Sequence, residues 1–306
     1  MSDLWDFLRG ALMTKALAAV VDAGVPEALA DGPRPVAELQ GDPDTMHRLL
    51  RALASDDVFR ETEPGVFEHT ERSRLLLAPG WSEFAHLFGG VFYEATKDLD
   101  ASTVEPPFPR RFGTGFWEWL AEHPAERATF DAAMAAERGR PADRLAALEW
   151  RDGEVVVDVG GGNGALLCGL IQRRPELRGI VFDLPETVRD EAALGDRIEF
   201  VAGSFFDSVP EGDAYVLSGI LHDWSDDEAT RILRTIRTAA PAHARLLINE
   251  SVIRPGEEPD GAKWLDLLML VLAGGRERSE EQWRALLEAG GFEIESLESP
   301  MVATCR

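Results

Sequence analysis

Residues 155–164 read Val-Val-Val-Asp-Val-Gly-Gly-Gly-Asn-Gly, and this stretch decides the fold. A continuous apolar run is typical of a buried parallel strand. The glycines after it let the backbone turn sharply and approach a ligand closely. The segment Ala165–Arg173 then has the pattern of a helix whose free backbone N–H groups point back at the turn. Strand, turn and helix together predict a nucleotide-type site at the carboxyl edge of an α/β sheet.

The rest of residues 151–306 alternates between strand and helix patterns, which predicts a doubly wound, Rossmann-like sheet. Strands are expected at Val155–Val159, Gly179–Asp183, Ile198–Ala202, Ala214–Ser218, Arg245–Glu250 and Phe292–Leu297. Ser225 and Glu228 form a capping box that opens a helix reaching to about Ala239. Trp264–Leu272 is apolar nearly all round, which predicts a buried helix.

Residues 1–90 predict a separate, α-helical, winged-helix-like domain. Helices are expected at Leu12–Val21, at Val36–Leu39 and at Thr45–Ala54 with Asp44 as its cap, followed by a hairpin of Val58–Glu61 and Val66–His69 around Pro64-Gly65. Residues 91–150 then predict a helical connector with a loop at Glu105–Pro109 and helices at Phe116–Leu120 and Ala125–Ala136.

Composition narrows the function. The 306 residues carry a net charge of −24, which argues against nucleic acid and anionic membranes as partners. Residues 1–90 alone hold 8 Lys/Arg against 15 Asp/Glu, so dimerisation suits the winged helix better than DNA binding. We expect a cytoplasmic protein, because there are two cysteines, no signal-like start and no apolar stretch of the ~20 residues needed to cross a bilayer.

The glycine pattern has two readings. Gly160-x-Gly162-x-x-Ala165 fits dinucleotide binding, whereas Asp158-x-Gly160-x-Gly162-x-Gly164 resembles motif I of the class I methyltransferases. Asp183 follows Asp158 by 25 residues, which suits a carboxylate at the end of the next strand that binds ribose hydroxyls. The position of the unit, halfway along the chain, favours S-adenosylmethionine. A structural turn without ligand is the alternative.

His222 lies in the loop between the fourth strand and the capped helix, on the same sheet edge as the glycine turn. An imidazole pKa of about 6.5 suits a general base at neutral pH. Glu250, at the end of the fifth strand, and Glu277, in the loop Gly274–Ser279, can reach this edge and orient the ring. For Glu277, a surface salt bridge with Arg276 or Arg278 is an equal alternative.

Several segments together resemble the His-dependent O-methyltransferase family, which includes plant caffeic acid O-methyltransferases and actinobacterial polyketide and anthracycline methyltransferases. The resemblance covers nearly the whole chain and rests on Val157–Gly164, Phe182–Pro185, Gly203–Pro210, Leu221–Asp226, Gly274–Ser279 and Ala289–Phe292. It implies transfer of a methyl group from S-adenosylmethionine to a phenolic hydroxyl of an aromatic, polyketide-type molecule, and a homodimer formed through the N-terminal domain.

The resemblance also implies site residues. His222 is the expected base, flanked by Glu250 and Glu277. The expected cofactor-binding residues are Asp158, Gly160, Gly161, Gly162, Asp183, Leu184, Ser204, Phe205, Phe206 and Ser218. The expected substrate-binding residues are Trp117, Phe130, Met134, Asp223, Asp266, Met269 and Leu270, although the large residues before position 150 also suit an ordinary core. No metal is expected.

Two positions depart from the family pattern. Ser204 stands where an acid usually lies beside the adenine, and Ser218 stands where plant members usually have Lys. Two alternatives therefore stay open: methylation of carbon or nitrogen, and use of the bound cofactor without methyl transfer. The winged-helix outline leaves a third, a regulator that responds to a small molecule.

Overall fold

The computed structural model describes residues 3–136, 139–185, 187 and 196–306, and the chain divides into two compact units. One unit comprises residues 1–97 and 123–136, and the other comprises residues 98–122 and 137–306. Each unit has its own buried apolar core.

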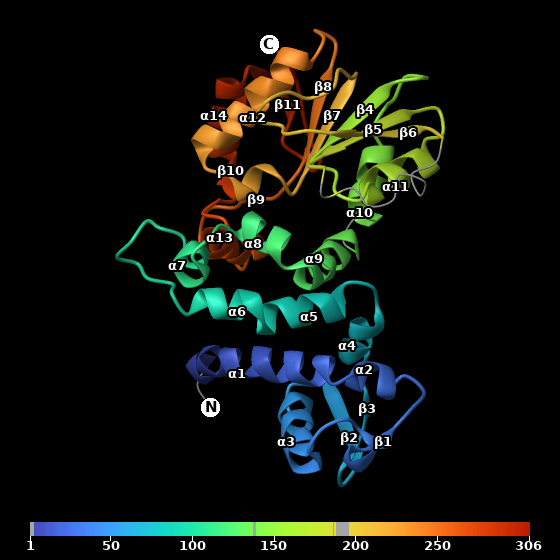
Figure 1. Cartoon of the computed structure of the whole chain (residues 1–306), viewed down its shortest axis with the longest axis vertical. Coiled ribbons are helices and arrows are strands. Elements are labelled where there is room, and N and C mark those ends of the chain that lie inside the picture. Colours follow the sequence, from blue (N-terminus) through green and yellow to red (C-terminus); the bar gives the residue numbers. More distant parts are fainter. Residues whose placement is uncertain (1–2, 137–138, 186, 188–195) are drawn as a thin grey trace. The chain divides into compact units, whose positions relative to one another are not determined.

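The first unit is mainly helical (Figure 1). Its elements are α1 (Asp3–Asp22), α2 (Val25–Ala28), β1 (Arg34–Pro35), the 3₁₀ helix η1 (Val36–Glu38), α3 (Pro43–Ala54), β2 (Phe59–Glu63), β3 (Val66–His69), α4 (Glu71–Arg74), the 3₁₀ helix η2 (Leu75–Leu77), α5 (Trp81–Gly89), α6 (Val91–Thr96) and α9 (Pro124–Ala136). The predicted hairpin is confirmed as β2 and β3, and β1, which was not predicted, adds a third strand to an antiparallel sheet in the order β1-β3-β2. Leu50, Phe59 and Phe67 are buried between α3 and this sheet.

The cap of α3 differs from the prediction. The helix begins at Pro43, whose fixed φ suits the first helical position, so the cap falls on Asp42 rather than on Asp44. Asp42 Oδ1 accepts a hydrogen bond from the Thr45 N–H at 2.9 Å.

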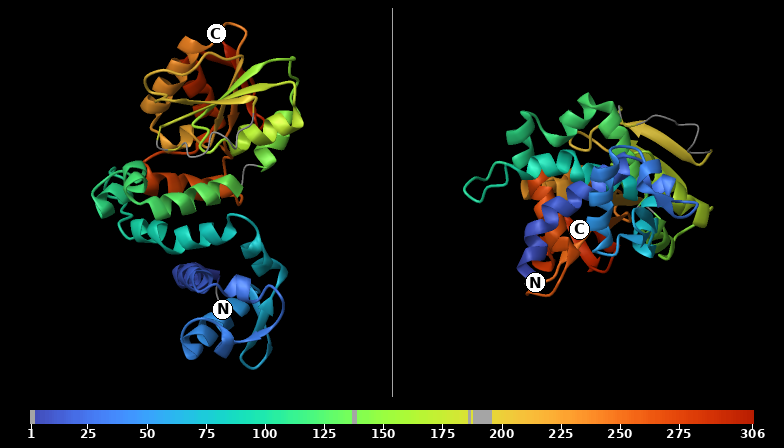
Figure 2. Two further views of the ribbon diagram at one scale, coloured as in Figure 1. Left: turned by 45° about the vertical axis from the view of Figure 1, so that its right-hand side comes forward. Right: turned by 90° about the horizontal axis from the view of Figure 1, so that it is seen from below.

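The second unit contains a seven-stranded sheet in the order β11-β12-β8-β7-β4-β5-β6 (Figures 1 and 2). Its strands are β4 (Val155–Val159), β5 (Arg178–Asp183), β6 (Ile198–Ala202), β7 (Ala214–Ser218), β8 (Arg245–Asn249), β11 (Phe292–Ser296) and β12 (Met301–Cys305). The first five are parallel, and β12 runs antiparallel to both of its neighbours. The prediction missed β12.

Helices cover both faces of this sheet. The remaining elements are α7 (Pro107–Phe112), α8 (Phe116–Glu122), α10 (Gly139–Ala146), α11 (Ala165–Arg173), the 3₁₀ helix η4 (Leu221–Asp223), α12 (Asp226–Ala239), β9 (Val252–Ile253), α13 (Gly261–Leu272), β10 (Arg278–Ser279) and α14 (Glu280–Gly290). Helices α12 and α14 pack on one face and α10 and α11 on the other. Alternate residues of β4 accordingly enter different cores, with Val157 on one side and Val156 on the other.

Two expectations about the helices are wrong. Pro107–Pro109 starts α7 instead of continuing a loop, because proline is tolerated in the first helical turn, where no N–H partner is required. The helix α13 is only partly buried, since Trp264 is 67% exposed and Leu270 is 41% exposed.

The chain order within the sheet defines a switch point. From β4 the chain proceeds outward through β5 and β6, and it then returns to place β7 on the other side of β4. Open α/β sheets bind ligands outside the carboxyl ends of the strands at such a reversal. The loops that follow β4 and β7 meet at this edge.

Candidate active site

The loop after β4 forms an open glycine turn. Gly160 and Gly162 have φ of +73° and +60°, a conformation that L side chains rarely adopt. The Gly160 N–H donates to the Phe182 carbonyl at 2.8 Å, and the Gly162 N–H donates to Asp183 Oδ2 at 2.8 Å. A Cβ added at Gly162 would meet no atom of the described residues within 4 Å, so the described part of the chain leaves open space beside the turn.

The two carboxylates that were expected to bind the cofactor, Asp158 and Asp183, both lie beside this turn. Asp158 is buried near the end of β4, directly below Gly161, where an added Cβ would approach its carboxylate to 2.8 Å. Asp183 ends β5 and also accepts from the Leu184 N–H at 2.7 Å, while the Leu184 side chain is exposed. The backbone of the turn is thus held by the carboxylate that was expected to bind ribose.

His222 lies in η4, directly after β7, and is bound to Glu277. Its Nδ1 donates to Glu277 Oε1 at 2.6 Å, with the imidazole 16% exposed and the Glu277 side chain fully buried. The alternative of a surface salt bridge for Glu277 is wrong, because Arg276 and Arg278 both pair with Asp226 instead.

Two further carboxylates surround the imidazole. Glu250, directly after β8, accepts from the backbone N–H groups of Ile220 and Leu221 at 3.1 and 2.7 Å, which fixes the start of the loop. Asp223 Oδ1 lies 3.6 Å from His222 Nε2. The ring therefore has a carboxylate beside each nitrogen.

These charges control the protonation of the site. Burial alone lowers the pKa of His222, but the charges of Asp223, Glu277 and Glu250 and the hydrogen bond to Glu277 outweigh it and raise this pKa to about 10. Burial raises the pKa of Asp223 to about 7, against the opposing charge of His222, and burial also raises the pKa of Glu250. The carboxylates around His222 therefore favour the protonated form of its imidazole.

The expected substrate-binding residues divide between the two units. Asp266, in α13, accepts from the Glu277 N–H at 2.8 Å and so helps to hold the loop that carries the carboxylate. Met269 is buried and Leu270 is exposed on the same helix, and Trp117 is half-buried in α8. Phe130 and Met134 are half-buried in α9, which belongs to the other unit.

The residues expected beside the adenine form an aromatic cluster after β6. The Phe206 ring packs on Trp224 at 4.8 Å and on Phe205 at 5.0 Å between centroids. Ser204 Oγ accepts from the Phe206 N–H at 3.2 Å. Ser218, at the end of β7, is buried and accepts from Asn249 Nδ2 at 3.0 Å. Both serines thus have partners within the chain.

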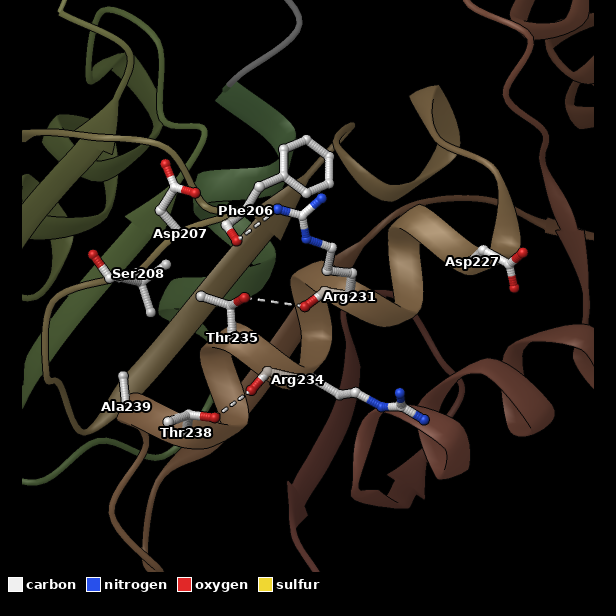
Figure 3. A pocket seen from close by; sticks show the side chains of 10 residues that line it. Phe206, Asp207, Ser208, Asp227, Arg231, Arg234, Thr235, Thr238 and Ala239 are labelled. Atoms are coloured by element: carbon white, nitrogen blue, oxygen red, sulfur yellow. Dashed lines mark hydrogen bonds between the residues drawn. The ribbon is translucent and has the colours of Figure 1, made fainter.

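A surface groove of about 580 Å³ runs along α12 (Figure 3). It is lined by Phe206, Asp207, Ser208, Val209, Asp227, Arg231, Arg234, Thr235, Thr238 and Ala239. The Arg231 guanidinium covers the Phe206 ring at 4.9 Å and donates to the Phe206 carbonyl at 3.2 Å. None of His222, Glu250 and Glu277 lines this groove, which shares only Phe206 with the residues expected at the cofactor.

Sequence reasoning missed two residues that shape the His222 loop. An added Cβ at Gly275 would collide with the His222 carbonyl oxygen and the Asp223 backbone, so only glycine fits there. Arg278 is fully buried beneath the same loop, although the sequence suggested a surface partner for Glu277. The paired glycines at 274 and 275 were the available signal, since such a pair indicates close backbone approach.

Comparison with known proteins identifies the family. Residues 92–293 match the O-methyltransferase domain, and residues 5–79 match the O-methyltransferase dimerisation domain. The chain belongs to the O-methyltransferase family. This agrees with the sequence-based resemblance and with the sheet described above.

Individual relatives cover nearly the whole chain. The phenazine O-methyltransferase PhzM of Lysobacter antibioticus is 38% identical over 96% of this chain and 91% of its own length. The 8-amino-8-demethylriboflavin N,N-dimethyltransferase of Streptomyces davaonensis is 37% identical over 91% of this chain and 86% of its own length. The neocarzinostatin-biosynthesis O-methyltransferase NcsB1, solved with S-adenosyl-L-homocysteine and 1,4-dihydroxy-2-naphthoic acid, has 31% identity and a TM-score of 0.79 over 95% of this chain and 94% of that one.

No described helix is both long and apolar enough to span a membrane. No group of three or more His, Cys, Asp or Glu side chains in the described part of the chain is arranged to hold a metal ion.

Proposed function

We propose that this chain transfers the methyl group of S-adenosylmethionine to a phenolic hydroxyl of an aromatic natural product, with His222 as general base. The observation that carries the proposal is the 2.6 Å bond between His222 Nδ1 and Glu277, formed at the strand end next to the glycine turn. Glu277 sets the tautomer, which leaves Nε2 to face the acceptor.

The glycine turn suits the cofactor. The open space at Gly162 and the backbone held by Asp183 give a cradle for a flat, hydroxylated ligand. In this proposal Asp158 and Gly160–Gly162 contact the methionine part, Asp183 and Leu184 lie at the ribose, and Ser204, Phe205, Phe206 and Ser218 lie on the adenine side. When bound, S-adenosylmethionine supplies an already activated methyl group.

The chain itself supplies alignment and proton removal. A phenol with a pKa near 10 is mostly protonated at pH 7. His222 takes this proton as the oxygen attacks, and the three neighbouring carboxylates stabilise the imidazolium that results. The same carboxylates raise the pKa of His222, so the imidazole retains the proton that it accepts.

The acceptor is an aromatic ring system. Relatives act on phenazines and are found with a hydroxylated naphthoic acid. We propose that Trp117, Asp223, Asp266, Met269 and Leu270 contact the acceptor. Phe130 and Met134 stay predictions, as does the division of the chain into a dimerisation domain (1–90), a connector that contributes to the substrate pocket (91–150) and a catalytic domain (151–306).

A homodimer through the N-terminal unit is part of the proposal. The match to the dimerisation domain supports it. Five large apolar side chains of α1 are also exposed in the single chain, namely Leu4, Trp5, Phe7, Leu8 and Leu12. Exposed apolar surface of this extent is typical of a protein interface.

The test is a mass-spectrometric assay with S-adenosylmethionine and a set of hydroxylated phenazines and naphthoic acids. We expect a product heavier by one methylene group, formed together with an equal amount of S-adenosylhomocysteine. Methylation only of amino-substituted analogues would favour N-methylation, the chemistry named for the riboflavin relative. An altered product with unspent cofactor would overturn methyl transfer.

A further inference from the structure

Arg278 is a fully buried cation close to the His222 loop. Removing a guanidinium from water costs several kcal/mol unless hydrogen bonds and an opposite charge compensate for it. The hydrogen-bond partners of the Arg278 guanidinium therefore indicate its structural role.

The guanidinium reaches both ends of the turn that carries His222. Its Nη1 donates to the Leu221 carbonyl at 2.8 Å, and its Nη2 donates to the Trp224 carbonyl at 2.9 Å. Its Nε donates to Asp226 Oδ1 at 2.9 Å, at the start of α12. The planar group also lies 5.4 Å from the centre of the Trp283 ring. One rigid fork thus spans the residues on both sides of His222 and Asp223.

Neighbouring residues hold two different parts of the same loop. Arg278 belongs to β10, which pairs in parallel with β9. Glu277, one residue earlier, binds the imidazole of His222, whereas Arg278 binds the backbone on either side of it. A displacement of β10 would therefore move both the His222 imidazole and the backbone on either side of it.

We propose that Arg278 is a positioning residue for the methyl-transfer reaction: it fixes the turn Leu221–Trp224 so that His222 keeps its bond to Glu277 and presents Nε2 to the acceptor. This inference rests on the proposed role of His222 as base. Arg278 touches neither substrate nor cofactor in this account, and it acts through the backbone of the loop.

Arg276 provides a matched control. Its side chain is half exposed and pairs with Oδ2 of the same Asp226 at 3.2 Å. Replacing it removes a positive charge of equal size next to the same carboxylate and leaves the three bonds of Arg278 in place. A difference in effect between the Arg276 and Arg278 variants would therefore come from the loss of the three Arg278 hydrogen bonds and not from the loss of a positive charge.

The experiment compares Arg278→Gln, Arg278→Lys and Arg276→Gln with the wild-type chain. For each, kcat, KM for the acceptor and the Kd of S-adenosylhomocysteine are measured. The titration of the His222 imidazole is followed by NMR in the unliganded protein, assigned with His222→Gln. Circular dichroism and thermal unfolding establish that each variant is folded.

We expect Arg278→Gln to lower kcat by about 10²-fold, as a displacement near 1 Å does, with the Kd of S-adenosylhomocysteine unchanged. The pKa of His222 should fall towards its ordinary value as contact with Glu277 loosens. Arg278→Lys should restore part of kcat, because an ammonium cannot make all three bonds of the fork. Arg276→Gln should behave like the wild type. If Arg278→Gln does not fold, Arg278→Lys carries the test.

Wild-type kcat and wild-type His222 titration in a folded Arg278 variant would overturn the inference. Equal losses in the Arg276 and Arg278 variants would overturn it as well. A wild-type chain without any methyl transfer contradicts the proposed function instead, and in that case the NMR titration still decides whether Arg278 positions the ring.

Discussion

The two neighbouring strand ends at the switch point are built in different ways. The turn after β4 takes its shape from its own glycines and from bonds to the next strand, at Phe182 and Asp183. The loop after β7 is held by residues far along the chain, since Glu250, Glu277 and Arg278 lie 29, 55 and 57 positions from their partners. The first region is local and open, whereas the second is assembled from distant segments and is buried. A cofactor-binding turn can be formed by neighbouring segments of the chain, whereas a general base needs charged side chains brought to it from distant segments.

The largest expected effect changes turnover, which depends on the loop after β7, and leaves cofactor binding by the turn after β4 unchanged. His222→Ala should lower turnover by about 10²–10⁴-fold, the usual contribution of a general base. The Kd of S-adenosylhomocysteine should not change, because the glycine turn is intact. Single-turnover kinetics and isothermal titration calorimetry measure the two quantities. Turnover within about tenfold of the wild type would show that His222 is not the base.

Removing the charge of Glu277 tests the electrostatics of the buried region. Glu277→Gln should lower the pKa of His222 from about 10, because one of the charges that raise it is gone. The ascending limb of the kcat/KM profile should then move to lower pH, with a loss of kcat from poorer orientation of the ring. An unchanged profile would contradict the assignment of this limb to His222.

The same pair makes a prediction for stability. A histidine whose folded pKa is raised stabilises the fold fully below its unfolded pKa of about 6.5, and this contribution is lost as the pH rises through the folded value of about 10. The free energy of unfolding of the wild type should therefore decrease more steeply over this range than that of Glu277→Gln. Urea unfolding at a series of pH values measures the difference, and parallel curves would refute the linkage.

Two alanine substitutions should give opposite kinetic signatures. Gly275→Ala places a Cβ against the backbone of His222, so kcat should fall while cofactor affinity is kept. Gly162→Ala meets no neighbour among the described residues but costs about 1–2 kcal/mol in the left-handed region, so the free turn should relax and the cofactor has to restore its conformation, which lowers affinity by roughly tenfold. The Kd of S-adenosylhomocysteine and kcat at saturating cofactor distinguish them. The reverse pattern would contradict the division of labour between the two strand ends.

The smallest effect concerns the adenine side. Ser204→Asp restores the acid that the family usually has there, and one added hydrogen bond should tighten cofactor binding by about 1 kcal/mol. Calorimetry with S-adenosylhomocysteine measures this gain, and Ser208→Asp, in the nearby α12 groove, serves as the charge control. Weaker binding by Ser204→Asp would show that the aromatic cluster at Phe205 and Phe206 places the adenine elsewhere.

The same contrast explains how far the sequence could be read. Strand β4, helix α11 and the capping box of α12 follow local rules, and the predicted bounds Val155–Val159 and Ala165–Arg173 are confirmed. The sequence also indicated His222 and Glu277, because both follow recognisable motifs. Their bond was one of two equal alternatives for Glu277, and the sequence could not choose between them because the choice depends on how β10 packs beneath η4.

The features that the sequence analysis missed or predicted wrongly also have physical reasons. Strand β12 has the apolar composition of a strand, Met-Val-Ala-Thr-Cys, but the sequence analysis ended the sheet at Phe292–Leu297, and the antiparallel pairing of β12 with β8 and β11 establishes it as a further strand. Arg278 resembles an ordinary surface arginine until the carbonyl groups of Leu221 and Trp224 are seen around it. Exposure of Trp264 on α13 likewise depends on packing, which a single periodic pattern does not determine.

The central claim is that a cofactor in the turn after β4 lies against the imidazole carried by the loop after β7. A crystal structure with S-adenosylhomocysteine tests it most directly. We expect the ligand along Gly160–Gly162, with its sulfur facing His222 Nε2 while Nδ1 stays on Glu277. A ligand bound in the α12 groove, or an imidazole turned away from the sulfur, would contradict it.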